Sequence, residues 1–523
     1  MNQETKPMKS RDEWKQPGPL DVRLLTLLTG AKLLIHLLTI NRYGYFRDEL
    51  YFLDCARHID WGYVDHAPLI ALYAKTSLLL GGSLPALRLL PAIAGAAMVA
   101  LTMLIARQLG GGRFAQGLAA LCVIAAPVYL SVDSILTMNA FEPLFWMGCI
   151  YLLIRIVRTG NSRLWIWFGV LAGFGMENKH STLLFGLAVA VALLASPQRR
   201  ELLRPWIWIG GGIALLIFLP NLIWQIQHDF PTLEDLENVQ RTGKNFALGP
   251  LEFLWQQIFL LQPPLFPVWL VGLASLLAGK GRRMRVLGWV YVVLLLTMIT
   301  LKAKNYYLVP IYPMLFAAGT VAIEGWLAQW TFSRERIWPK VAIATLVAII
   351  ALITIPAAVP LLPPEKLLAY QRFLGVAPPK TEVHHSGPLP QIFGDQFGWK
   401  ELVKKIADIY WSLPPEERER TAIFASNYGE AGAINLFGPA YGLPQAICAH
   451  QTHYFWGPRG FQGDTLIWLQ WDREWLEKLC RSAEQAGEHF HPWGMAEENR
   501  PIYICRGLKS PLPEMWPQLK HWN

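Results

Sequence analysis

The sequence predicts a polytopic α-helical membrane protein with a small α/β domain at its C-terminal end, and three observations lead to this. The chain of 523 residues is 53% hydrophobic and only 16% charged, whereas soluble globular proteins carry about 25% charged residues. Apolar stretches long enough to cross a bilayer, about 20 residues each, recur through its first two thirds. After about residue 363 the hydropathy falls and shorter patterns replace these stretches.

By this length criterion the chain contains about eleven apolar spans. They cover residues 24–40, 87–107, 117–136, 140–157, 164–177, 180–196, 205–226, 251–278, 286–301, 305–330 and 338–360. Residues 177–180 interrupt two neighbouring spans, which alternatively form one long bent helix over 164–196. Three prolines divide 251–278, so a short surface helix followed by a span is the alternative there.

The distribution of basic residues predicts the orientation in the membrane. Lysine and arginine are about twice as frequent in the connections on the side of the N-terminus, which places that side in the cytoplasm. An odd number of spans then places the C-terminal region outside. We therefore predict a cytoplasmic tail at 1–23, a membrane region at 24–362 with a first outer loop at 41–86, and an extracytoplasmic α/β domain at 363–523.

The net charge of +9 does not indicate a nucleic-acid partner, because the basic residues form short clusters between apolar spans without interleaved stacking aromatics. In the C-terminal region, residues 421–426, 465–471 and 501–505 have the pattern of buried strands, and 399–411 and 473–486 have helical spacing. An outside location would permit one disulfide among Cys448, Cys480 and Cys505, but the sequence does not determine the pair.

The first outer loop is rich in acids and aromatics. Asp48 and Glu49 directly follow the first span, and Asp65 and His66 precede the apolar stretch 69–80. That stretch is too short to span and has the composition of a helix lying in the membrane interface. Paired carboxylates at a membrane surface suit general-base chemistry on a hydroxyl or amine. The alternative is a solvated loop with interfacial aromatic anchors.

Other ionisable residues lie within or beside the spans, where they are energetically costly and often functional. In the predicted topology, several of these acids and lysines fall near the outer surface: Asp48, Asp65, Asp133, Lys179, Lys302 and Lys304. Carboxylates beside ammonium groups at the outer headgroups would suit a lipid-phosphate substrate. The alternative is a set of snorkelling lysines and helix-end caps.

Several catalytic signatures are missing from the chain. It has no GxxxxGK[ST] loop, which argues against ATP-driven transport by this chain alone. It also has no HExxH or GxSxG motif and no Cys/His set with zinc spacing. We therefore predict no metal-ligating residues.

Two segments of the first outer loop, GYFRDELYF and WGYVDHAPL, resemble the dolichyl-phosphate-mannose protein mannosyltransferase-like superfamily. This superfamily includes bacterial aminoarabinose lipid A transferases and is similar to glycosyltransferase family 39. The resemblance extends along most of residues 24–460 and includes LSVDSILTMNAFEPLFW, FLPNLIWQIQHDFPTLEDL, AKNYYLVPIYPMLFAAG and SNYGEAGAINLFGPAYGLPQAICAHQTHYFWGP. It implies the C-type glycosyltransferase fold in a bacterial inner membrane.

The resemblance also implies an activity, namely inverting transfer of a sugar from a polyprenyl-phosphate donor to a lipid, glycan or protein acceptor on the outer side. Carried over by position, Asp48 is the catalytic carboxylate and Glu49 its supporting partner. The residues expected to contact substrate are Asp65, His66, Arg88, Glu142, Lys179, Lys302, Lys304, Tyr306 and Tyr307. No nucleotide is expected, and whether a divalent cation assists is left open.

The chain departs from the family pattern at two positions. His66-Ala67 replaces the usual charged residue and proline, and Asn139 stands where many relatives have an acid. The absence of a β-trefoil insertion favours a bacterial enzyme. A lipid-sugar flippase is the main alternative function, but charges along a path through the bilayer or inverted repeats would then be expected. A receptor or scaffold would not need so many spans with ionisable groups.

Overall fold

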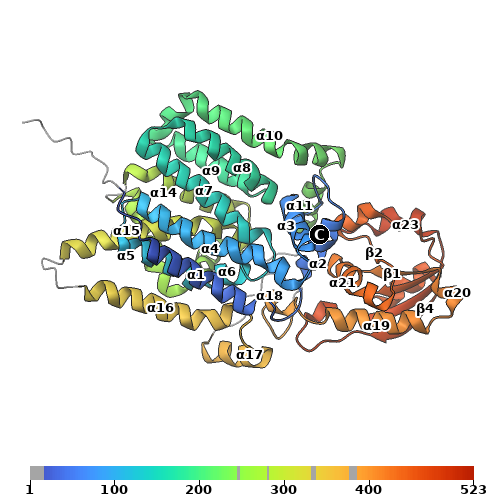
Figure 1. The fold of residues 1–523 in the computed structure, drawn as a ribbon. Helices are drawn as coiled ribbons and strands as arrows, with labels where there is room; N and C mark the ends of the chain where they lie inside the picture. The colour runs from blue at the N-terminus through green and yellow to red at the C-terminus, as the bar shows by residue number, and fades with distance from the viewer. Residues whose placement is uncertain (1–16, 244–247, 280–281, 331–336, 376–385, 523) are drawn as a thin grey trace, which may run out of the picture.

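The structure is a computed structural model that describes residues 17–243, 248–279, 282–330, 337–375 and 386–522. Most of the predicted N-terminal tail therefore lies outside the described residues. The chain forms a bundle of apolar helices and a C-terminal unit, residues 386–522, which contains the sheet (Figure 1).

Helices occupy every predicted span. They are α1 (Val22–Thr39), α4 (Leu84–Gln108), α5 (Arg113–Ala125), α6 (Pro127–Val132), α7 (Met138–Thr159), α8 (Trp165–Asn178), α9 (Thr182–Leu194), α10 (Pro205–Gln227), α12 (Pro250–Leu260), α13 (Phe266–Leu277), α14 (Arg285–Thr300), α15 (Tyr312–Trp330) and α16 (Trp338–Ala358). In the described part of the chain, six helices are long and apolar enough to cross a membrane, or eight if each of two bent pairs forms one span.

The breaks between helices follow the sequence. α8 and α9 are separate helices, not the single bent helix that was the alternative. The chain bends by 96° between α12 and the segment that begins at Pro263, because a proline cannot donate the hydrogen bond that a continuous helix needs. The segment 251–278 is therefore divided at its prolines, as in the alternative to a single continuous span.

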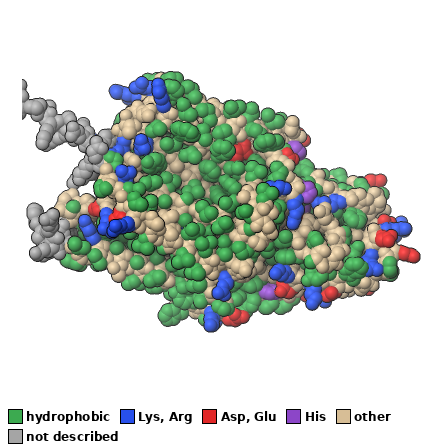
Figure 2. All heavy atoms as spheres, viewed as in Figure 1, with side chains coloured by type: hydrophobic (Ala, Val, Ile, Leu, Met, Phe, Trp, Pro, Cys, Tyr) green, Lys and Arg blue, Asp and Glu red, His purple; other side chains and the backbone are tan. Residues whose placement is uncertain are grey.

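The outer surface of the bundle is apolar over a broad area, as Figure 2 shows. Only 17% of the most apolar window of α10 and 22% of that of α16 is buried inside the protein. Leucine and isoleucine side chains exposed to this extent are stable in lipid but not in water. The chain is a multi-pass membrane protein.

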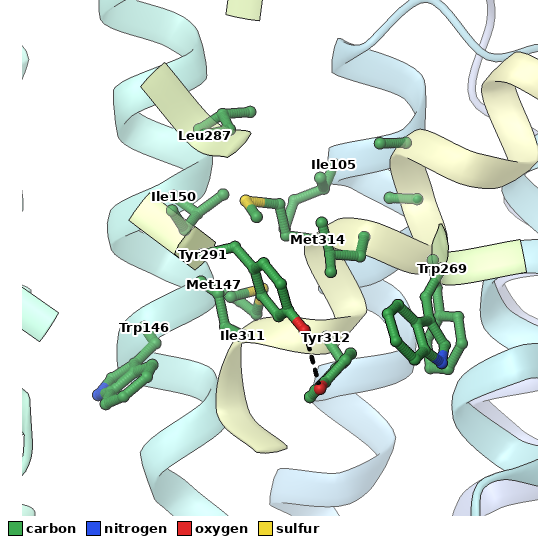
Figure 3. Close-up of a cluster of buried hydrophobic side chains, with 14 of the residues drawn as sticks. Ile105, Trp146, Met147, Ile150, Trp269, Leu287, Tyr291, Ile311, Tyr312 and Met314 are labelled. Carbon is green, nitrogen blue, oxygen red and sulfur yellow. Dashed lines mark hydrogen bonds between the residues drawn. The ribbon is translucent and has the colours of Figure 1, made fainter. Parts of the chain in front are cut away.

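The centre of the bundle holds large side chains from α4, α7, α13, α14 and α15 (Figure 3). Tyr291 and Tyr312 form a hydrogen bond of 3.2 Å between their hydroxyls there, and Gln257 of α12 accepts from Tyr312 at 3.3 Å. These contacts fix the start of α15. They thereby also fix the 3₁₀ helix η5 (Asn305–Ile311), which directly precedes it.

Short helices lie between the bundle and the C-terminal unit (Figure 1). They are α2 (Arg47–Arg57), α3 (Leu69–Leu79) and α11 (Pro231–Thr242), with α17 (Pro364–Phe373) and α18 (Gln391–Gly394) near the start of the unit. α3 corresponds to the apolar stretch for which an interfacial helix is predicted. α2 carries Asp48 and Glu49 in its first turn.

The C-terminal unit is built on a five-stranded sheet with the strand order β2-β1-β3-β5-β4. The strands are β1 (Thr421–Ala425), β2 (Ile447–Cys448), β3 (Thr465–Leu469), β4 (Cys480–Glu488) and β5 (Pro501–Leu508). β1 pairs in parallel with β2 and β3, and β5 is antiparallel to β3 and β4.

Alternate side chains of the inner strands face opposite layers of helices. Ile423, Ile467 and Ile504 pack with α19 (Trp399–Ser412) and α21 (Tyr428–Phe437). Phe424 and Trp468 face the other layer, to which α22 (Arg473–Leu479) and α23 (Leu512–Leu519) contribute. The short α20 (Pro415–Arg418) precedes β1.

The helical prediction for 473–486 is wrong after Leu479. The remaining residues form β4, an edge strand with mostly exposed, polar side chains, and such a strand lacks the apolar alternation that reveals a buried one. A disulfide between Cys480 and Cys505 links β4 to β5, with a Cα–Cα distance of 5.6 Å. Cys448 is a free, buried thiol.

Candidate active site

The helix α2 begins with a local capping arrangement that places its two acids. The backbone N–H of Phe46 donates to Oε2 of Glu49 at 2.8 Å, and both Asp48 and Glu49 lie in the first turn. Negative charge is favourable there because the helix dipole is positive at its N-terminus. The two neighbouring acids nevertheless have different surroundings, since Glu49 is fully buried and Asp48 is half-buried.

Glu49 and Arg88 form a buried ion pair with two hydrogen bonds, 3.0 and 2.9 Å long. Arg88 also donates to the carbonyls of Arg42 and Gly44, and Glu49 accepts from the backbone of Leu136 at 2.8 Å. A pair so fully engaged anchors α2 to α4. The structure therefore does not present Arg88 to substrate as predicted, because its guanidinium is occupied inside the protein.

Asp48 accepts a hydrogen bond of 2.9 Å from the hydroxyl of Tyr428, which lies 380 residues further along the chain. Tyr428 is the first residue of α21, so the C-terminal unit reaches the candidate carboxylate directly. Its ring stacks on Tyr51 of α2 at 4.7 Å between centroids. Sequence reasoning assigned no role to Tyr428, although it lies in a segment similar to the family.

Asp65 and His66 lie on the same side of α2. Asp65 accepts a hydrogen bond of 2.8 Å from the hydroxyl of Tyr51. His66 is buried, stacks on Tyr63, and donates from Nδ1 to its neighbouring carbonyl. Burial lowers the pKa of His66 to about 4, although the charge of Asp48 raises it. The imidazole is therefore neutral at pH 7. We call Asp48, Tyr51, Asp65, His66 and Tyr428 the carboxylate group.

The C-terminal unit is attached to α2 by a second set of polar contacts. Asp54 accepts from Asn435 at 2.6 Å and from Nε2 of His453 at 3.1 Å. Gly432 of α21 lies so close to α2 that a Cβ there would be 2.6 Å from the carbonyl oxygen of Leu50. No role in the site was predicted for Asp54, Asn435, His453 or Gly432, because their contacts join segments that are far apart in the sequence.

A second polar cluster lies where α7, η5 and the connection between α8 and α9 meet. Lys179 donates to Asn139 at 2.8 Å and to Glu142 at 2.9 Å, and Glu142 also accepts from Ser181. The ammonium lies 4.1 Å from the ring centre of Tyr307 and 5.7 Å from that of Tyr306, which is a cation–π arrangement. We call Lys179, Asn139, Glu142, Tyr306 and Tyr307 the lysine group.

Lys302 and Lys304 lie in the chain just before η5, which contains Tyr306 and Tyr307. Lys302 has a φ of 50° and an exposed side chain, and Lys304 is half-buried. The turn they form leads into the two tyrosines. The structure thus brings Lys179 together with Tyr306 and Tyr307. Among the described residues, Lys302 makes no contact with this cluster.

The start of α7 connects the two groups. Glu49 binds the backbone of Leu136, Ala140 packs among the apolar residues of α2, and Asn139 and Glu142 hold Lys179. Other charges near the spans lie apart from both groups. Asp133 pairs with Lys32 of α1 at 2.8 Å, and His36 contacts Ser134 at 3.3 Å.

Within the described ranges, no group of three or more His, Cys, Asp or Glu side chains has the geometry to hold a metal ion. The chemistry that the site offers from its own side chains is a half-buried carboxylate oriented by a phenol, with an ammonium group near aromatic rings. A carboxylate of this kind accepts a proton, and an ammonium binds phosphate.

Residues 65–224 match the family described as dolichyl-phosphate-mannose-protein mannosyltransferase. The lipid A galacturonosyltransferase RgtD of Rhizobium johnstonii is 28% identical to the chain over 334 residues. That alignment covers 61% of this chain and 66% of RgtD, so the chain spans slightly less than two thirds of that relative.

Two solved structures of ArnT from Cupriavidus metallidurans have a similar fold. The structure bound to undecaprenyl phosphate superposes with a TM-score of 0.60 at 14% identity, covering 93% of this chain and 98% of that one. The apo structure gives a TM-score of 0.59 at 15% identity, covering 92% and 98%. At this level of identity the likeness establishes the fold, and function has to be argued from the site.

Proposed function

We propose that the chain, which is similar to the mannosyltransferase family, to RgtD and to ArnT, is a glycosyltransferase. It would transfer a sugar from a polyprenyl-phosphate donor to an extracytoplasmic lipid acceptor with inversion at the anomeric carbon. The observation that carries the proposal is the half-buried carboxylate of Asp48, which Tyr428 orients 2.9 Å away. The relatives' printed names support the substrate classes, since one acts on lipid A and the other binds undecaprenyl phosphate.

In the proposed reaction Asp48 accepts the proton of the acceptor hydroxyl. The hydroxyl oxygen forms a bond to the anomeric carbon as the bond from that carbon to the phosphate oxygen breaks. The electron pair leaves with the polyprenyl phosphate, and the configuration inverts because attack and departure occur on opposite faces. A positioned general base of this type contributes about 10²- to 10⁴-fold to a rate.

The lysine group is proposed to bind the departing phosphate. Lys179 is held by Glu142 and Asn139 in a fixed orientation, so little reorganisation is needed when negative charge develops on the leaving group. Tyr306 and Tyr307 border this position. Lys302 and Lys304 extend the positive charge toward the same end of the bundle. Glu49 and Arg88 act by anchoring α2.

We propose that the N-terminus is cytoplasmic and that the C-terminal unit lies outside, in a chain with about eleven spans. The Cys480–Cys505 disulfide supports this because disulfides persist in oxidising compartments. Figure 2 shows lysine and arginine side chains at the end of the bundle away from the C-terminal unit. Basic residues also lie at the ends of α4, α5, α7 and α16, for example Arg107, Arg113, Arg158 and Lys340. This distribution fits the positive-inside rule.

The proposal is tested with purified protein in vesicles that contain a lipid A acceptor and a panel of labelled polyprenyl-phosphate sugars. We expect the wild type to consume one donor, release polyprenyl phosphate and label the acceptor. A chelator arm of the same assay shows whether a divalent cation assists. Movement of intact donor between leaflets without consumption of any donor would replace the proposal with the flippase alternative.

A further inference from the structure

The C-terminal unit contains a cavity of about 370 Å³ outside the carboxyl ends of its parallel strands. Ser426 and Asn427 line it directly after β1, His450 after β2, and Gln470 after β3. The cavity therefore lies at the end of the sheet where β1, β2 and β3 finish. Loops that follow these three neighbouring strands line it. This volume is within the range of small-molecule sites.

The position of the cavity follows from the strand order. The chain leaves β1 for β2 on one side and returns to β3 on the other side of β1, so the connections diverge between β1 and β3. Open α/β sheets bind ligands at this point, outside the carboxyl ends of the strands. The same end of the sheet faces α2. Tyr428, which follows β1, contacts Asp48, and His453, which follows β2, contacts Asp54.

The lining offers both apolar and hydrogen-bonding surface. Trp475 is half-buried at the cavity and packs edge-on against the buried Trp468 at 5.4 Å. Gln470 uses its side-chain oxygen to accept from the backbone of Trp471 at 2.8 Å, which leaves the amide nitrogen for another partner. Gln518 also lines the cavity, and its side chain makes no hydrogen bond to another residue in the described part of the chain.

The charged groups that line the cavity favour a neutral ligand over an anion. Arg500 is its buried cation, but its guanidinium already lies 3.1 Å from Glu430 and donates to the carbonyl of Glu497 at 2.6 Å. A compensated guanidinium does not supply the uncompensated positive charge that a phosphate site uses. Amides together with an aromatic face instead match a sugar ring, whose hydroxyls donate and accept and whose C–H face is apolar.

We propose that this cavity is a saccharide-binding site, separate from the transfer site and occupied by one sugar ring packed on Trp475. A series of contacts links the cavity to the carboxylate of Asp48. The backbone N–H of Tyr428 donates to Nδ1 of His450 at 3.3 Å, and their rings stack at 5.0 Å. Because Tyr428 also binds Asp48, a sugar in the cavity lies one side chain away from the residue that orients the reacting carboxylate.

The test is saturation-transfer NMR on the full-length protein in lipid nanodiscs, with the methyl glycosides of galactose, glucose and galacturonic acid as probes. We expect signal from at least one glycoside with the wild type and with Asp48→Asn, because binding does not require transfer. Trp475→Ala should weaken binding about tenfold, since aromatic contacts contribute up to about 1.5 kcal/mol. Gln518→Ala, a change of an exposed side chain, should weaken it as well.

Trp471→Ala is the matched control, because Trp471 is an exposed neighbour outside the cavity lining. It should leave binding unchanged. Equal binding by the wild type and by both cavity variants would overturn the proposal, as would a lack of signal from every glycoside. Displacement of bound glycoside by inorganic phosphate would assign the cavity to anions and would also overturn it. Failure of the transferase proposal would leave these binding results unaffected.

Discussion

The carboxylate group and the lysine group differ in the range of the contacts that hold them. Asp48 is oriented by Tyr428, 380 residues away, whereas Lys179 is held by Glu142 and Asn139, 37 and 40 residues away. The proposed phosphate site is therefore built within the helix bundle. The proposed base depends on docking of the C-terminal unit, which makes that unit part of the active site.

The largest expected effect concerns the anchor beneath both groups. Replacing Glu49 with Gln leaves Arg88 as an uncompensated buried charge, and we expect a loss of about 3–5 kcal/mol in the free energy of unfolding. Thermal unfolding in detergent measures this. Arg473→Gln, which breaks an exposed pair with Glu477, should change stability by less than about 1 kcal/mol. Equal effects would show that the Glu49–Arg88 pair is not an anchor.

Acid should loosen the carboxylate group. Burial lowers the pKa of His66 from 6.5 to about 4 and also lowers that of His453. The unfolded chain therefore binds protons between pH 6.5 and 4 that the folded chain does not. The contribution of His66 is constant above pH 6.5, and about 3 kcal/mol is lost as the pH falls to 4.

Melting temperatures measured from pH 7.5 to pH 4 check this expectation. His66→Gln removes the titrating group, so the decrease in this variant should be smaller than in the wild type. An unchanged slope would assign the acid sensitivity to other groups.

Removing the ammonium of the lysine group should affect donor use. We expect Lys179→Met to lower kcat/KM for the polyprenyl-phosphate donor about 100-fold, because an oriented cation stabilises the leaving phosphate. Lys302→Met changes an exposed side chain outside this cluster and should cost less than about tenfold. If the Lys302 variant were the more damaged, the assignment of phosphate binding would have to be exchanged between these lysines.

The smallest expected effect concerns the long-range contact between Tyr428 and Asp48. Tyr428→Phe removes the hydroxyl that donates to Asp48 and should lower kcat about tenfold while the KM for donor stays constant. Tyr441→Phe, an exposed change in the same unit, is the control. An unchanged kcat, or a loss confined to KM, would show that the Tyr428 hydroxyl does not orient the reacting carboxylate.

Much of this arrangement was predictable from the sequence. Apolar length alone located the helices of the bundle. The acids after the first span were singled out, but the helix α2 that carries them was not predicted. The buried strands β1, β3 and β5 were recognised because their side chains are apolar. The polar edge strand β4 was predicted to be helical, because its exposed residues carry no signal of burial.

Residue partners were much harder to predict than residue positions. Arg88 was expected at the substrate, but its guanidinium satisfies Glu49 and two carbonyls. Tyr428 and His453 were missed because nothing in the sequence states which surface of a distant unit will contact α2. The glycine at 432 is a local signal of close packing, yet it does not identify the partner helix.

The most direct test of the central claim is single-turnover release of polyprenyl phosphate by the wild type, Asp48→Asn and Asp60→Asn in the same vesicles. Asp60 is an exposed acid in the same outer loop and is the matched control. We predict that Asp48→Asn binds donor normally but releases polyprenyl phosphate at least about 100-fold more slowly, whereas Asp60→Asn matches the wild type. Release by Asp48→Asn at the wild-type rate would contradict the account.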